Sequence, residues 1–168
     1  GRLAWAVLLS AVLAAALVGP ACQKDLEERT PALTILYTGA LVGKAEPCGC
    51  FSGDFGGLVR IAGFVNQVRA ETPNTLYVDL GDLLHEHERM GYHLHKQFPL
   101  KADMMLDALE SMNCAAMVPG DFDFAAGPET LAELSEGRDF PFVLANVVQA
   151  ETGEALFPAS TITQVGPW

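Results

Sequence analysis

The feature that most constrains the fold is a regular alternation of strand-like and helix-like segments. Apolar, β-branched runs typical of strands cover residues 33–38, 75–80, 115–118, 140–147 and 160–165. Apolar residues recur at helical spacing over 58–70, 100–112 and 128–134, the last opened by a proline. Strands separated by helices of about a dozen residues predict βαβ units. We therefore expect an α/β fold with a mainly parallel, layered sheet flanked by helices.

Two long connections follow expected strands, over residues 39–57 and 81–99. In a parallel sheet, ligands bind at the carboxyl ends of the strands, where both connections begin. Connections of this length inside a compact domain are usually functional or disordered. These two connections are therefore the places where residues that bind a ligand or carry out chemistry are most expected.

The N-terminal segment is typical of an export signal. Arg2 precedes an apolar run over residues 3–18, which small residues connect to Cys22. We expect a signal peptide over 1–21, a polar tether over 22–31 and one domain over 32–168. Cys22 then becomes a lipid-modified N-terminus, and the protein is a periplasmic or cell-surface lipoprotein anchored to the membrane. A buried core helix and ordinary cleavage before Cys22 without lipidation are the alternatives.

The charge balance excludes one class of partner. The formal net charge is −11, whereas binding to nucleic acid polymers requires clustered lysine and arginine against the phosphates. We therefore expect no nucleic acid polymer as a partner, and the acidity can equally be a matter of solubility. Three cysteines follow Cys22, and this odd number excludes a fully paired intrachain disulfide framework.

Acidic residues follow two of the expected strands. Asp82 comes directly after the second strand, and Gly81 before it allows a tight turn. Asp121 and Asp123 follow the third strand, where both could point at a metal ion or could equally be turn residues. Because the carboxyl ends of parallel strands meet at one edge of the sheet, we expect Asp82 and Asp121 to approach one divalent metal ion. Each can equally be an ordinary turn or capping residue.

Sulfur and imidazole groups lie in the two long connections. Cys48 and Cys50 are separated by one residue, a strained spacing for a disulfide, so we expect them to bind a soft metal ion at the same edge or to act in redox chemistry. Free thiols packed under the loop are the alternative. All four histidines fall in the second connection, at His85, His87, His93 and His95. Two His-x-His pairs suit zinc or copper, but the spacing imposes no geometry, and we interpret them as ordinary loop residues.

Five segments carry a family resemblance. They read I-L-Y-T-G-A-L-V-G at 35–43, G-G-L-V-R at 56–60, L-Y-V-D-L-G-D at 76–82, G-D-F-D-F-A at 120–125 and F-P-F-V-L-A-N-V at 140–147. In order and spacing they resemble the calcineurin-like metallophosphoesterase superfamily in its 5′-nucleotidase branch. That branch reads roughly I-L-H-T-N-D-L-H-G, G-G-L-A-R, L-x-x-D-x-G-D, G-N-H-E-F-D and F-P-x-x-x-A-N-V. The resemblance implies that family's fold, with residues 32–168 holding only the N-terminal part of its domain.

The resemblance also implies roles for single positions. Asp82 matches the aspartate that bridges two metal ions, and Asp121 matches an asparagine ligand. The aspartate and histidine that hold the family's first ion match Ala40 and Val42, which carry no ligand atom. The family's catalytic histidine matches Phe122. Since the family's reaction needs both ions, the resemblance implies a degenerate two-metal site.

The expected function follows from these matches. We expect an exported, lipid-anchored protein similar to 5′-nucleotidases, with a divalent metal ion and a phosphorylated small molecule or nucleotide as ligand, and with little ordinary nucleotidase activity. The P-C-G-C segment at 47–50 resembles an exported subgroup of this fold in which it replaces the usual metal motif. Two alternatives stay open: an active metal-dependent phosphoester hydrolase with an altered site, and a soft-metal or redox module that uses Cys48 and Cys50.

Overall fold

The computed structural model describes residues 33–50, 53–87, 89, 91 and 96–168, and for Cys48, Cys50 and residues 53–55 it describes the backbone alone. The chain divides into two units, Gly1–Thr30 and Pro31–Trp168. Everything described belongs to the second unit, so the expected signal peptide, tether and lipidated Cys22 lie outside the described residues. No helix of the described part is long and apolar enough to cross a membrane.

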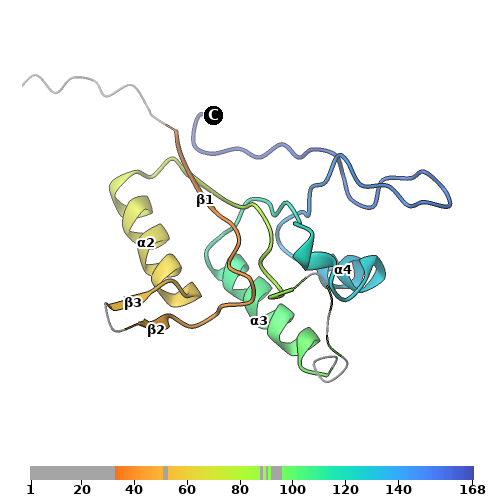
Figure 1. Ribbon diagram of the computed structural model, residues 1–168. Helices are drawn as coiled ribbons and strands as arrows, with labels where there is room; N and C mark the ends of the chain where they lie inside the picture. Colours follow the sequence, from red (N-terminus) through yellow and green to blue (C-terminus); the bar gives the residue numbers. More distant parts are fainter. Residues whose placement is uncertain (1–32, 51–52, 88, 90, 92–95) are drawn as a thin grey trace, which may run out of the picture. The chain divides into compact units, whose positions relative to one another are not determined.

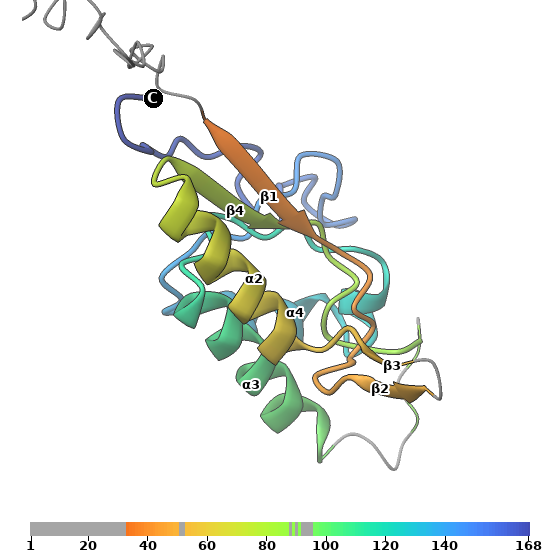
Figure 2. The same cartoon turned by 90° about the vertical axis from the view of Figure 1, so that its left-hand side faces the viewer.

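This unit contains a parallel sheet. Strand β1 (Thr34–Thr38) pairs with β4 (Thr75–Asp79) from Thr34 opposite Thr75 to Thr38 opposite Asp79. The first strand is labelled β1 in Figure 1, and β1 and β4 lie side by side in Figure 2. Single parallel bridges continue the sheet from Asp79 to Met117 and from Met117 to Phe142. The prediction of one sheet is therefore confirmed for the runs 33–38 and 75–80. The runs 115–118 and 140–147 lie beside them in the expected order, but they form no strands and contribute one bridging residue each.

Helices connect the sheet segments, as the alternation predicted. Helix α2 (Leu58–Glu71) lies between β1 and β4 in the chain, and α3 (Phe98–Ser111) follows β4. The third sheet segment is the run 115–118, which joins the sheet through Met117. A short 3-10 helix, η2 (Phe122–Phe124), and α4 (Pro128–Ser135) come after it. Figure 2 shows α2 and α3 side by side along the sheet.

The core lies between the sheet and these helices. Its fully buried members include Tyr77 of β4, Met105 and Leu109 of α3, and Leu83 and Leu84, which directly follow β4. Burying a large apolar side chain contributes about 1.5–3 kcal/mol to stability. The last two leucines therefore hold the loop after β4, with its carboxylate, firmly against the body of the domain.

Two further sequence-based expectations were wrong. The run 160–165 forms no strand, and Ile162 in it is almost fully exposed, because β-propensity produces a strand only where a neighbouring strand pairs with it. The first long connection is also not irregular throughout. Strands β2 (Cys48–Cys50) and β3 (Gly53–Phe55) pair antiparallel within it, with Cys48 opposite Phe55 and Cys50 opposite Gly53.

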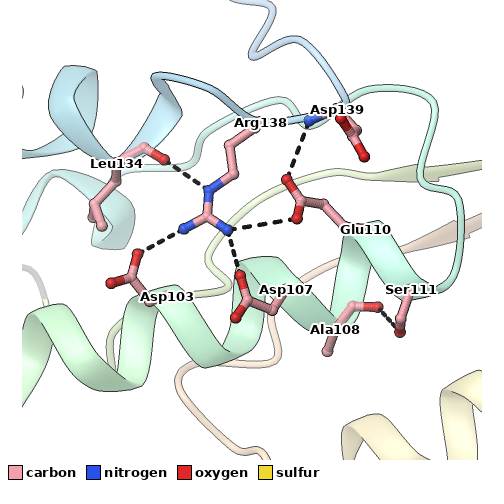
Figure 3. A network of polar contacts seen from close by, with 8 residues as sticks. All are labelled: Asp103, Asp107, Ala108, Glu110, Ser111, Leu134, Arg138 and Asp139. Carbon is pink, nitrogen blue, oxygen red and sulfur yellow. Dashed lines mark hydrogen bonds and ion pairs between the residues drawn. The ribbon is translucent and has the colours of Figure 1, made fainter.

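Arg138 ties the segment after α4 to α3 (Figure 3). Its guanidinium donates to Asp103 and Asp107 at 2.6 Å each, lies 3.8 Å from a carboxylate oxygen of Glu110, and donates to the Leu134 carbonyl at 3.1 Å. The three carboxylates lie along one face of α3 and would repel one another without this cation. Because the Arg138 side chain is only 11% exposed, its ion pairs are better shielded from solvent than ordinary surface pairs.

Replacement of Arg138 by methionine is expected to lower the free energy of unfolding by about 2 kcal/mol, because three carboxylates lose their shared cation. Urea unfolding of the variant and the parent measures this. Asp103→Asn removes only one exposed partner and should cost about 0.5 kcal/mol. Equal stability of the Arg138→Met variant and the parent would show that the network contributes nothing.

Candidate functional site

The carboxylate of Asp82 lies where the loops after β4 and after the third sheet segment meet. Its Oδ1 accepts a hydrogen bond from the Phe122 backbone N at 3.0 Å, and the Asp82 side chain is half-buried. Gly120 packs so closely on this carboxylate that a Cβ there would overlap it. The structure thus brings the neighbourhood of Asp121 to Asp82, while the Asp121 side chain itself is exposed.

Asp123 joins the loop after β4 to the loop at Gly120 through hydrogen bonds to its carboxylate. Its side chain is 1% exposed and accepts four backbone hydrogen bonds, from Asp82, Leu83, Leu84 and Gly120, at 2.8–2.9 Å. Burial raises the pKa of the Asp123 carboxyl, while the four donors act to lower it. The sequence left open whether Asp123 points at a metal or closes a turn. All the contacts found for its carboxylate are to backbone N–H groups, which supports the turn.

The segment after β1 lies against the same loop through its backbone. The N–H groups of Ala40 and Val42 donate to the carbonyls of Gly81 and Asp82, at 2.8 and 2.7 Å. Ala40, Val42 and Asp82 all have left-handed backbone, with φ of 54°, 42° and 52°. This conformation is strained for alanine and more so for valine, whereas aspartate and histidine adopt it several-fold more often than most residues. Such strain tends to gather at functional sites, and no sequence signal indicated it here.

A second carboxylate, Asp79 at the end of β4, is fully buried beneath this loop. It accepts hydrogen bonds from the Thr38 hydroxyl at 2.6 Å and from the Gly81 N–H at 2.9 Å, and the Thr38 hydroxyl also contacts the Tyr77 hydroxyl at 2.7 Å. Burial raises the pKa of Asp79 to about 6, and the two donors only partly offset it. Asp79 thus links the ends of β1 and β4 through the Thr38 hydroxyl. When its carboxyl group is ionised, the burial of the charge lowers the stability of the folded state.

This cost predicts a pH dependence of stability. Between the ordinary pKa of 3.8 and the folded value of about 6, the folded state binds more protons than the unfolded state. The contribution of Asp79 to the free energy of unfolding therefore falls as the pH rises through this window, by up to about 3 kcal/mol. Asp79→Asn removes the charge, and its amide can still donate to the Thr38 hydroxyl.

The stability difference between Asp79→Asn and the parent should shift in favour of asparagine from pH 4 to pH 6 and stay level above it. Urea unfolding across this range measures the effect, because the two proteins differ only at this carboxyl group. A difference that does not change with pH would contradict the raised pKa.

An open cavity of about 850 Å³ adjoins the segment after β1. It is lined by residues 40–47, Gly56, Gly57, Lys101 and Met104. Lys44 and Lys101 both lie against one carboxylate oxygen of Glu86, at 3.1 and 3.7 Å. The hydrogen bond from Lys44 lowers the pKa of Glu86. Nothing in the sequence indicated that these three residues meet.

The structure describes only some of the remaining candidate ligands, which are the cysteines and histidines. The side chains of Cys48 and Cys50 and all of His93 and His95 lie outside the described residues. His85 is buried, and its ring lies 5.5 Å from that of Phe98. The third cysteine after the tether, Cys114, is buried, and burial raises the pKa of its thiol to about 12. Among the described residues, no group of three histidine, cysteine, aspartate or glutamate side chains is placed to hold a metal ion.

Comparison with known sequences gives a consistent set of relatives. The chain is 32% identical over 109 residues to a 2′,3′-cyclic-nucleotide 2′-phosphodiesterase/3′-nucleotidase of Haemophilus influenzae. The match covers 64% of this chain and 17% of the relative, so the chain spans about a sixth of that protein's length. No family model matches the chain.

Solved structures agree with the sequence relatives. A 5′-nucleotidase precursor from Thermus thermophilus superposes with a TM-score of 0.65 and 28% identity, over 80% of this chain and 26% of its own. The calcineurin-like phosphoesterase YfkN from Bacillus subtilis superposes with a TM-score of 0.60 and 27% identity, over 75% of this chain and 40% of its own. The fold predicted from the sequence is therefore confirmed over the matched part.

Proposed function

Because the chain belongs to the calcineurin-like phosphoesterase superfamily, in its 5′-nucleotidase-like branch, we propose that it is an exported, lipid-anchored member whose two-metal site is degenerate. It binds a nucleotide or another phosphorylated small molecule and has little ordinary nucleotidase activity. This proposal rests on Ala40 and Val42, whose backbone has a conformation that suits aspartate and histidine, whereas their side chains carry no atom that can bind a metal ion.

That contrast is specific to the positions where the family holds its first ion. Ala40 and Val42 keep a left-handed backbone that suits aspartate and histidine, and both donate to the loop that carries Asp82. Their side chains offer no oxygen, nitrogen or sulfur. Phe122, at the place of the family's proton donor, likewise has no titratable group. Among the described residues no group of three ligand side chains is placed to hold a metal ion, which supports a degenerate two-ion site.

We propose that the protein binds a single divalent metal ion. Its ligands are Asp82 and Asp121, with Cys48 and Cys50 reaching it from the first long connection. Metal content of the purified full-length protein under reducing conditions tests this. Loss of metal in both Asp82→Ala and the double variant Cys48→Ser/Cys50→Ser would support all four ligands. Metal that survives the double variant but not Asp82→Ala would exclude the thiols.

Activity is tested by restoring the missing groups. We expect the full-length protein to open 2′,3′-cyclic AMP to a monophosphate, and to release phosphate from 3′-AMP and 5′-AMP, far more slowly than the typical enzyme turnover of about 10 per second, with Mn²⁺ or Mg²⁺ present. The variant Ala40→Asp/Val42→His should bind additional metal, and adding Phe122→His should bring measurable hydrolysis. Ala40→Gly/Val42→Gly is the matched control, since it relaxes the same backbone without adding a ligand. Turnover by the unmodified protein at an ordinary enzymatic rate would refute the degenerate site.

The export part of the proposal has its own test. Mass spectrometry of the membrane fraction should find a mature N-terminus at Cys22 with attached acyl chains and without residues 1–21. Two lipid signals are needed for stable membrane attachment, and a diacylated or triacylated cysteine meets that requirement. A soluble form that begins at Cys22 with a free thiol would refute the lipid anchor.

A further inference from the structure

The cavity beside the segment after β1 has a largely apolar wall, and the charged residues that line it are Lys44, Lys101 and Glu46. Its volume is about 850 Å³, which is within the range of small-molecule sites. Leu41, Val42, Pro47 and Met104 are among the residues that line it. Such a lining suits a ligand with an apolar body, while a few charged groups fix its orientation.

The ammonium groups of Lys44 and Lys101 both contact the carboxylate of Glu86. Lys44 and Lys101 come from segments far apart in the chain, yet both ammonium groups lie within 4 Å of one Glu86 oxygen. Gly43 makes room for this arrangement, because a Cβ at residue 43 would lie only 2.8 Å from the Lys101 Nζ atom. Among the described ion pairs, both positive charges are joined to the one Glu86 carboxylate and neither to Glu46, in a chain whose net charge is −11.

The shared carboxylate is a replaceable partner. The side chain of Glu86 is 42% exposed, and those of Lys44 and Lys101 are 59% and 39% exposed. Ion pairs at this exposure are weak, so Glu86 can turn into solvent at little cost when another anion arrives. A doubly charged anion would then balance both ammonium groups, which one carboxylate does not.

We infer that this cavity binds a small organic dianion with an apolar body, held by Lys44 and Lys101 without a metal ion. A tetrahedral phosphoryl group has enough acceptor oxygens to accept hydrogen bonds from both ammonium groups. This inference rests on the proposed function. The lysines hold the anion beside Ala40 and Val42, the positions where the metal ligands of the family are missing.

The test is calorimetric titration of the full-length protein with phenylphosphonate, a dianion that resists hydrolysis, in the presence of a metal chelator. We expect saturable binding of one molecule per chain. Lys44→Met and Lys101→Met should each weaken binding about tenfold, since each removes one charged hydrogen bond. Glu86→Gln should tighten it several-fold by removing the competing carboxylate. Benzoate, a monoanion with the same ring, should bind more weakly than phenylphosphonate.

Lys96→Met is the matched control, because Lys96 is an exposed lysine near the start of α3 that does not line the cavity. It should bind phenylphosphonate like the parent, and Lys101→Arg should recover most of the affinity lost in Lys101→Met. Unchanged binding in both lysine-to-methionine variants, binding that the chelator abolishes, or weaker binding in Glu86→Gln would each overturn the inference. Nucleotide turnover by the parent protein would refute the degenerate metal site and leave this binding result standing, so the two proposals fail separately.

Discussion

Replacement of Asp123 by alanine is expected to lower the free energy of unfolding by about 4 kcal/mol, the largest effect of any substitution considered. The side chain is buried and accepts four backbone hydrogen bonds that join the loop after β4 to the loop at Gly120. Alanine would leave those N–H groups without a partner in a place where water has little access. Each unsatisfied buried donor costs about 1–3 kcal/mol, and partial water entry keeps the total below the full sum.

Urea unfolding of Asp123→Ala, Asp123→Asn and Asp121→Ala provides the comparison. Asparagine keeps one acceptor oxygen but turns an NH₂ group toward backbone donors, so we expect a loss of about 2 kcal/mol. Asp121 is exposed two residues earlier, and its replacement should change stability by less than about 0.5 kcal/mol. If Asp123→Ala were as stable as Asp121→Ala, Asp123 would not hold these loops together.

Replacement of Gly81 by alanine is expected to cost about 3 kcal/mol or more. Gly81 has φ of 84°, and a Cβ there would overlap the Gly120 backbone N and the Val118 carbonyl oxygen. Left-handed backbone costs a residue with a Cβ about 1–2 kcal/mol, and overlap with backbone atoms adds about 1–3 kcal/mol because they cannot turn aside as a side chain can. The same change would push apart the two loops that flank Asp82.

Gly63→Ala is the matched control for this prediction. Gly63 lies in α2, and nothing surrounds the position of its missing Cβ. Alanine there should stabilise the protein by about 0.5–1 kcal/mol, because it favours the helix. Thermal unfolding should therefore shift in opposite directions for the two glycine variants. A shift in the same direction would show that crowding around Gly81 is not what constrains it.

Local sequence patterns were sufficient for most of the framework. Helix α2 covers Leu58–Glu71 where apolar spacing predicted 58–70, and α3 covers Phe98–Ser111 where it predicted 100–112. The spacing works because side-chain direction repeats every 3.6 residues in a helix and every two in a strand. The run 160–165 has the composition of a strand and forms none, since a strand also needs a partner that its own composition does not specify.

The contents of the site depended on contacts between distant segments. Asp82 and Asp123 are 41 residues apart, as are the partners Thr38 and Asp79. Lys44 and Lys101, which meet at Glu86, come from opposite sides of it in the chain. The resemblance assigned Asp82, Ala40 and Val42 to positions of one metal site, and in the structure the Ala40 and Val42 N–H groups donate to the carbonyls of Gly81 and Asp82, because the order of parallel strands brings their carboxyl ends to one edge. The residue spacing alone could not tell that Asp123 would be used entirely by backbone donors, or that two lysines would face a cavity. Such roles depend on burial and on which groups lie within hydrogen-bond distance, and both arise only when the loops pack against the core.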